Sequence, residues 1–356
     1  MNNTVQNTLS KLLKLNPETT QLSTISSGHI NSTWLLTHFD QRFIVQKLNT
    51  HVFKYPAQIV SNAQLIEQHL NTKQKQKNYP LDIVKHINTG NNEYLTILNE
   101  EPYRVLNYIE HSYSEDVVKN PEQAHQAALA FGTFASALHD FDTATLHTVI
   151  DDFHNLAMRF EQLNTAMTHS DESRLNRSKK DIEFCLSQQH LVDELKAITQ
   201  HLPIRVCHND TKINNMLYCS KTHKAKAVID LDTCMPGFLL HDFGDMVRTF
   251  CCAEAEDSTR LDKVVIRKEV FEALVKGYLA PLKPILSKQE QLSLLLGAKI
   301  MPLMLSVRFL TDYLNNDVYF KTAHPEHNLV RTQNQLALYK NILVNEAWMY
   351  ETLMKQ

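Results

Sequence analysis

Three polar side chains in the middle of the chain have the types and the spacing that phosphate chemistry requires. Asp210 follows His208 by two positions, Asn215 comes five positions after Asp210, and Asp230 ends the apolar run 227–229. A carboxylate can accept the proton of an attacking hydroxyl, while an amide oxygen and a second carboxylate are hard ligands suited to Mg²⁺. Phosphoryl transfer needs both, because metal ions neutralise the phosphate oxygens. The spacing predicts Asp210 as the base and Asn215 and Asp230 as metal ligands.

Apolar residues surround this polar loop. Val206-Cys207 and Met216-Leu217 bracket it, and residues 224–229 read as a short strand that leads directly into Asp230. A His-Asn-Asp triplet alone is typical of a polar turn, and an aspartate after a strand is often a cap. Both pieces together, in this context, indicate the catalytic loop and metal strand of a phosphotransferase.

A second candidate metal triplet, Asp242-Phe243-Gly244, spells the protein-kinase motif letter for letter. It follows Pro236 and the residues 237–241, which do not read as a strand. Asp230 is therefore the better metal carboxylate. We predict a structural role for Asp242, holding the catalytic loop by hydrogen bonds.

The loop 208–215, Ile229-Asp230 and Asp242 twelve residues later resemble the aminoglycoside phosphotransferase and choline kinase superfamily. The resemblance covers nearly the whole chain and is closest to the N-acetylhexosamine 1-kinase branch. It implies a protein-kinase-like fold, ATP and Mg²⁺ as cofactors, and transfer of the γ-phosphoryl to a sugar hydroxyl, the anomeric hydroxyl of an N-acetylhexosamine. The segments that resemble this branch are 46–49, 52–53, 211–215, 229–237, 308–314 and 317–321.

The turn 26–31 joins two predicted strands, where a kinase-like fold places the loop that covers the phosphates. Gly28 and Asn31 are its predicted nucleotide contacts, although one glycine is not a glycine-rich run and a plain hairpin remains the alternative. In the next strand, Gln46 takes the position at which many kinases carry a phosphate-binding lysine, and Lys47 lies beside it. Because side chains alternate along a strand, Gln46 and Lys47 point to opposite faces of the sheet. Both are nucleotide-binding candidates, and the sequence is nearly as compatible with a surface position for Lys47.

The segment 308–321 mixes charge, hydroxyl groups and aromatic faces. Such a set suits a sugar, whose hydroxyls need fixed donors and acceptors and whose apolar face stacks on a ring. Without the resemblance, the same residues are a helix end and a loop; with it, they are predicted to bind the acceptor alongside the catalytic loop. The predicted acceptor contacts are Asp210, Lys212, Arg308, Asp312, Tyr313 and Tyr319.

The charge balance of this segment bears on the acceptor. Asp312 and Asp317 are offset by Arg308 and Lys321. A polycationic aminoglycoside would need a cluster of carboxylates, so the balance favours a neutral acceptor.

The order of elements predicts an α+β fold with two lobes. Strands dominate up to residues 103–109, which are expected to form the hinge, and helical patterns follow from Pro121. Residues 1–108 are the predicted nucleotide-binding lobe, and 109–356 the catalytic and substrate-binding lobe. Glu67, in a predicted helix, is either an orienting carboxylate or an exposed one.

Composition limits the partners. The chain has 356 residues and a net charge of -3, which suggests neither a nucleic-acid nor an anionic-membrane surface. The apolar stretch 292–310 contains Lys299 and Arg308, so a buried helix is expected rather than a membrane span. Six cysteines without metal or redox spacing, and no signal-peptide pattern, predict a cytoplasmic protein with reduced thiols.

Three rival functions stay open. The acceptor could be an aminoglycoside, another amino sugar or an amino alcohol. A nucleotidyl transferase on the same fold is a second rival, disfavoured by the intact Asp210. A non-catalytic nucleotide-binding protein is a third, disfavoured by retention of Asp210, Asn215 and Asp230 together.

Overall fold

A computed structural model of the chain describes residues 3–25, 30–90 and 93–356. It contains two compact units, which are described separately below. The predicted α+β, protein-kinase-like fold is confirmed, with an antiparallel sheet in the first unit and mainly helices in the second. The first unit is Met1–Tyr113 with Asp140–Asp151 and Leu217–Pro236, and the second is Ser114–His139 with Asp152–Met216 and Gly237–Gln356. Unlike the division at residue 108, this grouping assigns two later segments to the first unit.

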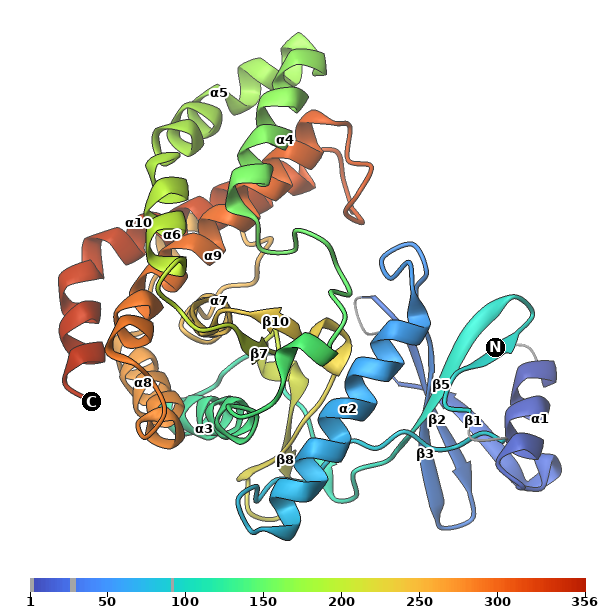
Figure 1. Cartoon of the computed structure of the whole chain (residues 1–356). Coiled ribbons are helices and arrows are strands. Elements are labelled where there is room, and N and C mark those ends of the chain that lie inside the picture. The colour runs from blue at the N-terminus through green and yellow to red at the C-terminus, as the bar shows by residue number, and fades with distance from the viewer. Residues whose placement is uncertain (1–2, 26–29, 91–92) are drawn as a thin grey trace. The chain divides into compact units, whose positions relative to one another are not determined.

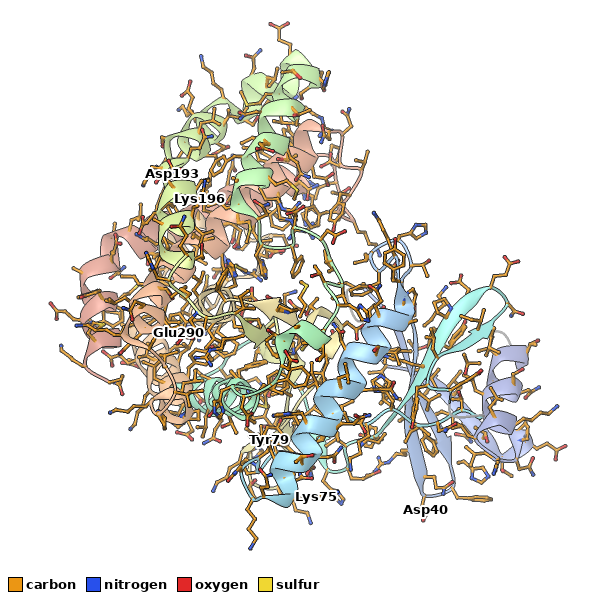
Figure 2. All side chains as sticks on the ribbon, in the orientation of Figure 1. Asp40, Lys75, Tyr79, Asp193, Lys196 and Glu290 are labelled. Atoms are coloured by element: carbon orange, nitrogen blue, oxygen red, sulfur yellow. The ribbon has the colours of Figure 1, made fainter. Side chains whose placement is uncertain are left out.

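The first unit is built on a five-stranded antiparallel sheet, drawn from blue to cyan in Figure 1. Its order is β1-β2-β3-β5-β4. Asp40, labelled in Figure 2, lies in the turn between β2 and β3. The strands are β1 (Thr20–Thr24), β2 (Ser32–His38), β3 (Gln41–Lys47), β4 (Thr96–Leu98) and β5 (Glu101–Asn107).

One face of this sheet packs against α1 (Asn3–Leu12). Leu36, Val45 and Val105 are fully buried there and form a cluster with Leu9 of the helix. Because side chains alternate along a strand, the neighbours of these residues in sequence point to the other face.

Residues 103–107 belong to β5, an inner strand that pairs with β3 on one side and β4 on the other. The prediction that residues 103–109 form the hinge is therefore wrong for this part. Residues 103–106 are buried inside the sheet although Arg104 is charged, and sequence alone could not separate such a strand from a connection between lobes.

The predicted helix after residue 56 is α2 (Pro56–Lys75), which starts with proline in its first turn. Its Asn62 explains why later segments join this unit. The Asn62 amide donates to the carbonyls of His147 (2.8 Å) and Cys234 (3.1 Å), and its oxygen accepts the His147 N–H (2.9 Å). Around these segments lie β6 (Ser112–Tyr113), β8 (Met216–Cys219), β9 (Ala225–Val228) and β10 (Met235–Gly237).

The second unit is a helical assembly, coloured from green to red in Figure 1, with the short strand β7 (Arg205–Cys207). The polar stretch 170–180 is mostly helix, because Asp171 caps α5 by accepting the N–H of Arg174 at 2.9 Å. The helices are α3 (Pro121–Ala137), α4 (Leu156–His169), α5 (Glu172–Ser187), α6 (His190–Thr199), α7 (Leu239–Phe250), α8 (Lys268–Leu282), α9 (Lys288–Leu314) and α10 (His327–Met354).

The central element of this unit is α9. A capping box between Ser287 and Glu290 starts it, and Glu290, labelled in Figure 2, also forms an ion pair with Arg205 at 2.9 Å. Among the described helices, α9 has the length and composition to cross a membrane, but 78% of its apolar window is buried inside the protein. The prediction of a buried helix for the apolar stretch 292–310 is therefore confirmed.

Candidate active site

The catalytic loop follows β7, and hydrogen bonds to α7 hold it in place. Asp242 accepts the backbone N–H of His208 at 2.9 Å and of Asn209 at 2.7 Å. The Thr211 hydroxyl donates to the Asp242 carbonyl at 2.6 Å. Asn209 has a φ of 63°, a left-handed conformation that asparagine tolerates. These bonds confirm the predicted structural role of Asp242.

Asp210 is held between two partners within the loop. Its Oδ1 lies 2.8 Å from the Lys212 ammonium, and its Oδ2 accepts from the Asn215 amide at 2.9 Å. Burial raises the pKa of Asp210, but Lys212, with help from His208 and Asn215, outweighs burial and leaves the pKa below its ordinary value. Asp210 is therefore an ionised carboxylate, in the state that a proton acceptor needs.

The two predicted metal ligands lie in different units. The Asn215 Nδ2 donates to the Asp210 carbonyl at 2.8 Å as well as to the carboxylate, and neither bond uses the amide oxygen of Asn215. Asp230 follows β9 as an exposed residue with a φ of 60°. An amide oxygen and a carboxylate fit a hard cation such as Mg²⁺.

The Phe-Gly part of the Asp-Phe-Gly triplet has a packing explanation. Phe243 is fully buried and packs against Phe271 and Tyr278, with ring centroids 6.3 and 5.7 Å apart. Gly244 faces Gly297 of α9, where a Cβ on either glycine would overlap a backbone carbonyl of the other helix. The triplet thus belongs to a helix crossing rather than to a metal strand.

Sequence reasoning missed a buried charge network on α7. The Arg248 guanidinium bonds Asp245 through two nitrogens at 3.0 and 2.8 Å, and reaches Glu256 at 3.0 Å. Burial lowers the pKa of Lys212, but Asp210 and then Asp245 raise it above its ordinary value. The signal was present in the sequence, because Asp242, Asp245 and Arg248 follow one another at helical spacing.

The first unit contains the predicted nucleotide contacts. Gly28 lies outside the described residues. The Asn31 amide donates to Asp232 at 2.6 Å, and Gln46 Oε1 accepts from the Arg104 guanidinium. Lys47 forms a half-exposed ion pair with Glu101 at 3.2 Å. Arg104, which sequence reasoning missed, is the buried cation of this group.

Glu67 does not meet a strand lysine. Its carboxylate accepts the backbone N–H of His86 at 3.0 Å. Neither expected alternative describes it fully, because it anchors a neighbouring segment of the first unit.

A pocket of about 560 Å³ lies in the second unit between α4, the end of α9 and the segment that follows α9. The Arg308 guanidinium packs near two aromatic rings, 5.4 Å from the ring centroid of Phe320 and 5.9 Å from that of Tyr319. Arg159 enters from α4 and donates to Gln162 at 3.0 Å. Burial and the like charge of Arg308 lower the pKa of Arg159 to about 10.

Asp312 and Tyr313, which were also predicted to contact the acceptor, instead hold the segments around the pocket in place. Asp312 lines the pocket, but its oxygens accept the N–H groups of Tyr319 (2.8 Å) and Phe320 (2.9 Å), so it positions the loop. Tyr313 does not line the pocket; its buried ring stacks on Arg174, whose guanidinium lies 4.5 Å from the ring centroid. Periodicity could not separate these roles, because they depend on where the loop returns after the helix.

The fold and the loop chemistry define a protein-kinase-like small-molecule phosphotransferase. Residues 21–272, more than half of the chain, match the model of the phosphotransferase enzyme family that includes the aminoglycoside phosphotransferases. The chain belongs to this family, whose members are kinases with an alcohol group as acceptor.

Solved structures show the same fold. An aminoglycoside phosphotransferase from Alicyclobacillus acidocaldarius is 14% identical with a TM-score of 0.58, over 95% of this chain and 94% of that one. Plasmodium vivax ethanolamine kinase is 13% identical with a TM-score of 0.60, over 94% and 88%. Spectinomycin phosphotransferase, solved with ADP and spectinomycin, is 13% identical with a TM-score of 0.55, over 94% and 93%. Sequence identities this low show a shared fold and nothing beyond it.

Proposed function

We propose that this protein transfers the γ-phosphoryl of ATP to a sugar hydroxyl, the anomeric hydroxyl of an N-acetylhexosamine. The observation that carries the proposal is the pocket in the second unit, where an arginine fork and aromatic rings line a volume of about 560 Å³. Rings stack on the apolar face of a sugar, and Arg308 can donate to a hydroxyl or an acetamido carbonyl. The resemblance of segments 308–314 and 317–321 to the N-acetylhexosamine 1-kinases supports the same acceptor.

ATP as donor is supported by the family and by the ADP found in spectinomycin phosphotransferase. Asn215 and Asp230 would hold Mg²⁺, which supplies charge neutralisation for the phosphate oxygens. Within the chain, the chemistry falls to Asp210. Its carboxylate, kept ionised by Lys212, accepts the proton of the acceptor hydroxyl. A carboxylate of low basicity suffices because an anomeric hydroxyl is more acidic than an ordinary alcohol.

The arrangement of charges disfavours a polycationic acceptor. Arg159 and Arg308 both line the pocket, and the hydrogen bonds of Arg159 go to neutral acceptors. Asp312 is engaged by backbone N–H groups, and Asp317 by Arg174 at 2.8 Å. Glu161, an exposed residue of α4, is the other carboxylate that lines the pocket, so few carboxylate oxygens are left for the several ammonium groups of an aminoglycoside.

A panel of acceptors tests the proposal. N-acetylglucosamine, N-acetylgalactosamine, kanamycin, choline and ethanolamine are incubated with ATP and Mg²⁺, and ADP release is measured for the native protein and for Asp210→Asn. We expect ADP release with an N-acetylhexosamine, phosphate on its C1 by ³¹P NMR, and loss of both in the variant. Faster turnover of kanamycin would replace the sugar with an antibiotic-type acceptor. Release of pyrophosphate, with AMP attached to the acceptor, would indicate nucleotidyl transfer instead.

A further inference from the structure

Strand β3 has no lysine at the position where kinases carry the lysine that binds the α- and β-phosphates. Gln46 occupies that position, and β3 pairs with β5 in a register that places Gln46 opposite Arg104. Val45 and Val105 are buried on the α1 face, so Gln46 and Arg104 share the opposite face. Lys47 alternates to the α1 face, where it pairs with Glu101. The sheet therefore keeps a cation on the face of Gln46, but on the neighbouring strand.

Arg104 is fixed in place by two partners. Gln46 Oε1 accepts from its Nε at 2.9 Å and from its Nη2 at 2.7 Å. The same Nη2 lies 2.5 Å from Asp232, and both side chains of this ion pair are 3% exposed. Burying an ion pair costs desolvation that its attraction barely offsets, so such a pair is weak evidence for stability alone. A role in binding an anion is one that this buried cation can fill on this face.

The partners of Arg104 connect it to the segments that would surround a nucleotide triphosphate. Asp232 follows the metal ligand Asp230 by two residues, and it also accepts the Asn31 amide at 2.6 Å. Asn31 directly precedes β2, and its oxygen accepts the N–H of Asn49 at 3.0 Å. In protein kinases, a glutamate orients the strand lysine. Here Asp232 takes that part, because Glu67 is bound to the His86 backbone.

We propose that Arg104 replaces the strand lysine as the residue that binds the α- and β-phosphates, with Gln46 and Asp232 positioning its guanidinium. The planar fork can contact two phosphate oxygens at once, which a lysine cannot do. This inference rests on ATP being the phosphoryl donor of the proposed function.

The test measures how much the phosphates add to nucleotide affinity. Calorimetry gives Kd for adenosine and for ADP with Mg²⁺ on the full chain, and the ratio of the two reports the phosphate contribution. In Arg104→Gln, we expect this ratio to fall by about 10- to 100-fold, the worth of charge-assisted hydrogen bonds, with adenosine affinity retained. Gln46→Lys combined with Arg104→Gln returns a cation to the usual position and should restore most of the ratio. Lys11→Gln, at an exposed lysine of α1 in the same unit, should leave it unchanged.

The structural alternative predicts a different pattern. If the ion pair only stabilises the unit, Arg104→Gln lowers the melting temperature and weakens adenosine and ADP equally, which would overturn the proposal. An unchanged ratio in a folded Arg104→Gln would overturn it as well. If Arg104→Gln does not fold, Arg104→Lys decides, because it keeps the buried charge beside Asp232 but loses the fork: a lower ratio supports the proposal, and a native ratio contradicts it. A native protein that binds no ADP would instead refute the donor in the proposed function.

Discussion

Asp242 should make the second unit lose stability as the pH rises through neutrality. Its carboxyl is 3% exposed, and burial raises its pKa to about 7, although the N–H groups of His208 and Asn209 act in the opposite direction. The ordinary value is 3.8. Because the folded state holds this proton more tightly than the unfolded chain does, the linked stability is fully present below pH 3.8 and is lost as the pH rises through 7.

The size of the effect follows from these two pKa values. Between pH 5 and pH 8, the wild-type protein should lose about 2–3 kcal/mol of unfolding free energy through this group. Asp242→Asn has a similar shape but no titrating proton. Its unfolding free energy should therefore lack this component, and the difference between wild type and variant should change by the same amount.

Tryptophan fluorescence during urea unfolding measures this difference. The chain has two tryptophans, Trp34 on β2 and Trp348 on α10. In a Trp34→Phe background, Trp348 alone reports on the second unit, where its ring packs 5.4 Å from that of Phe271. Asp193→Asn, which changes an exposed carboxylate on α6 labelled in Figure 2, is the matched control.

One result would contradict the predicted titration of Asp242. If the unfolding free energies of wild type and Asp242→Asn run parallel from pH 5 to pH 8, the Asp242 carboxyl is ionised throughout. The inference from its burial would then fail. Titrating groups that do not interact with Asp242 cancel because both proteins share them, whereas Asp245 and Asp210, whose charges also raise the pKa of Asp242, belong to the measured difference.

Three further predictions concern the chemistry. Asp210→Asn should lower kcat about 10²–10⁴-fold, the usual worth of a general base, with little change in ADP affinity; near-normal turnover in steady-state kinetics would remove Asp210 from this role. Asp230→Ala should abolish the Mg²⁺-dependent part of ADP binding in calorimetry, whereas Asp242→Asn should retain it; the reverse result would exchange their roles. Arg308→Ala should raise the KM for the sugar far more than the KM for ATP, because Arg308 lines the pocket; equal increases would argue against an acceptor contact.

Local sequence was sufficient for the catalytic loop. Asp210 and Asn215 lie five residues apart, so their contact follows from one short turn. The structural role of Asp242 was predictable for a related reason, because no strand pattern preceded it. The two-lobed α+β class followed from strands that precede helices along the chain.

Long-range packing decided the rest. Arg104 meets Gln46 across 58 positions of sequence, and only the register of β3 and β5 brings them together. Arg159 joins Arg308 in the pocket because α4 packs on α9. Spacing along one element is set by local backbone geometry, which a sequence displays directly. Contacts between elements depend on the burial of whole faces, and a shift of one residue in register would send each strand side chain to the other face of the sheet.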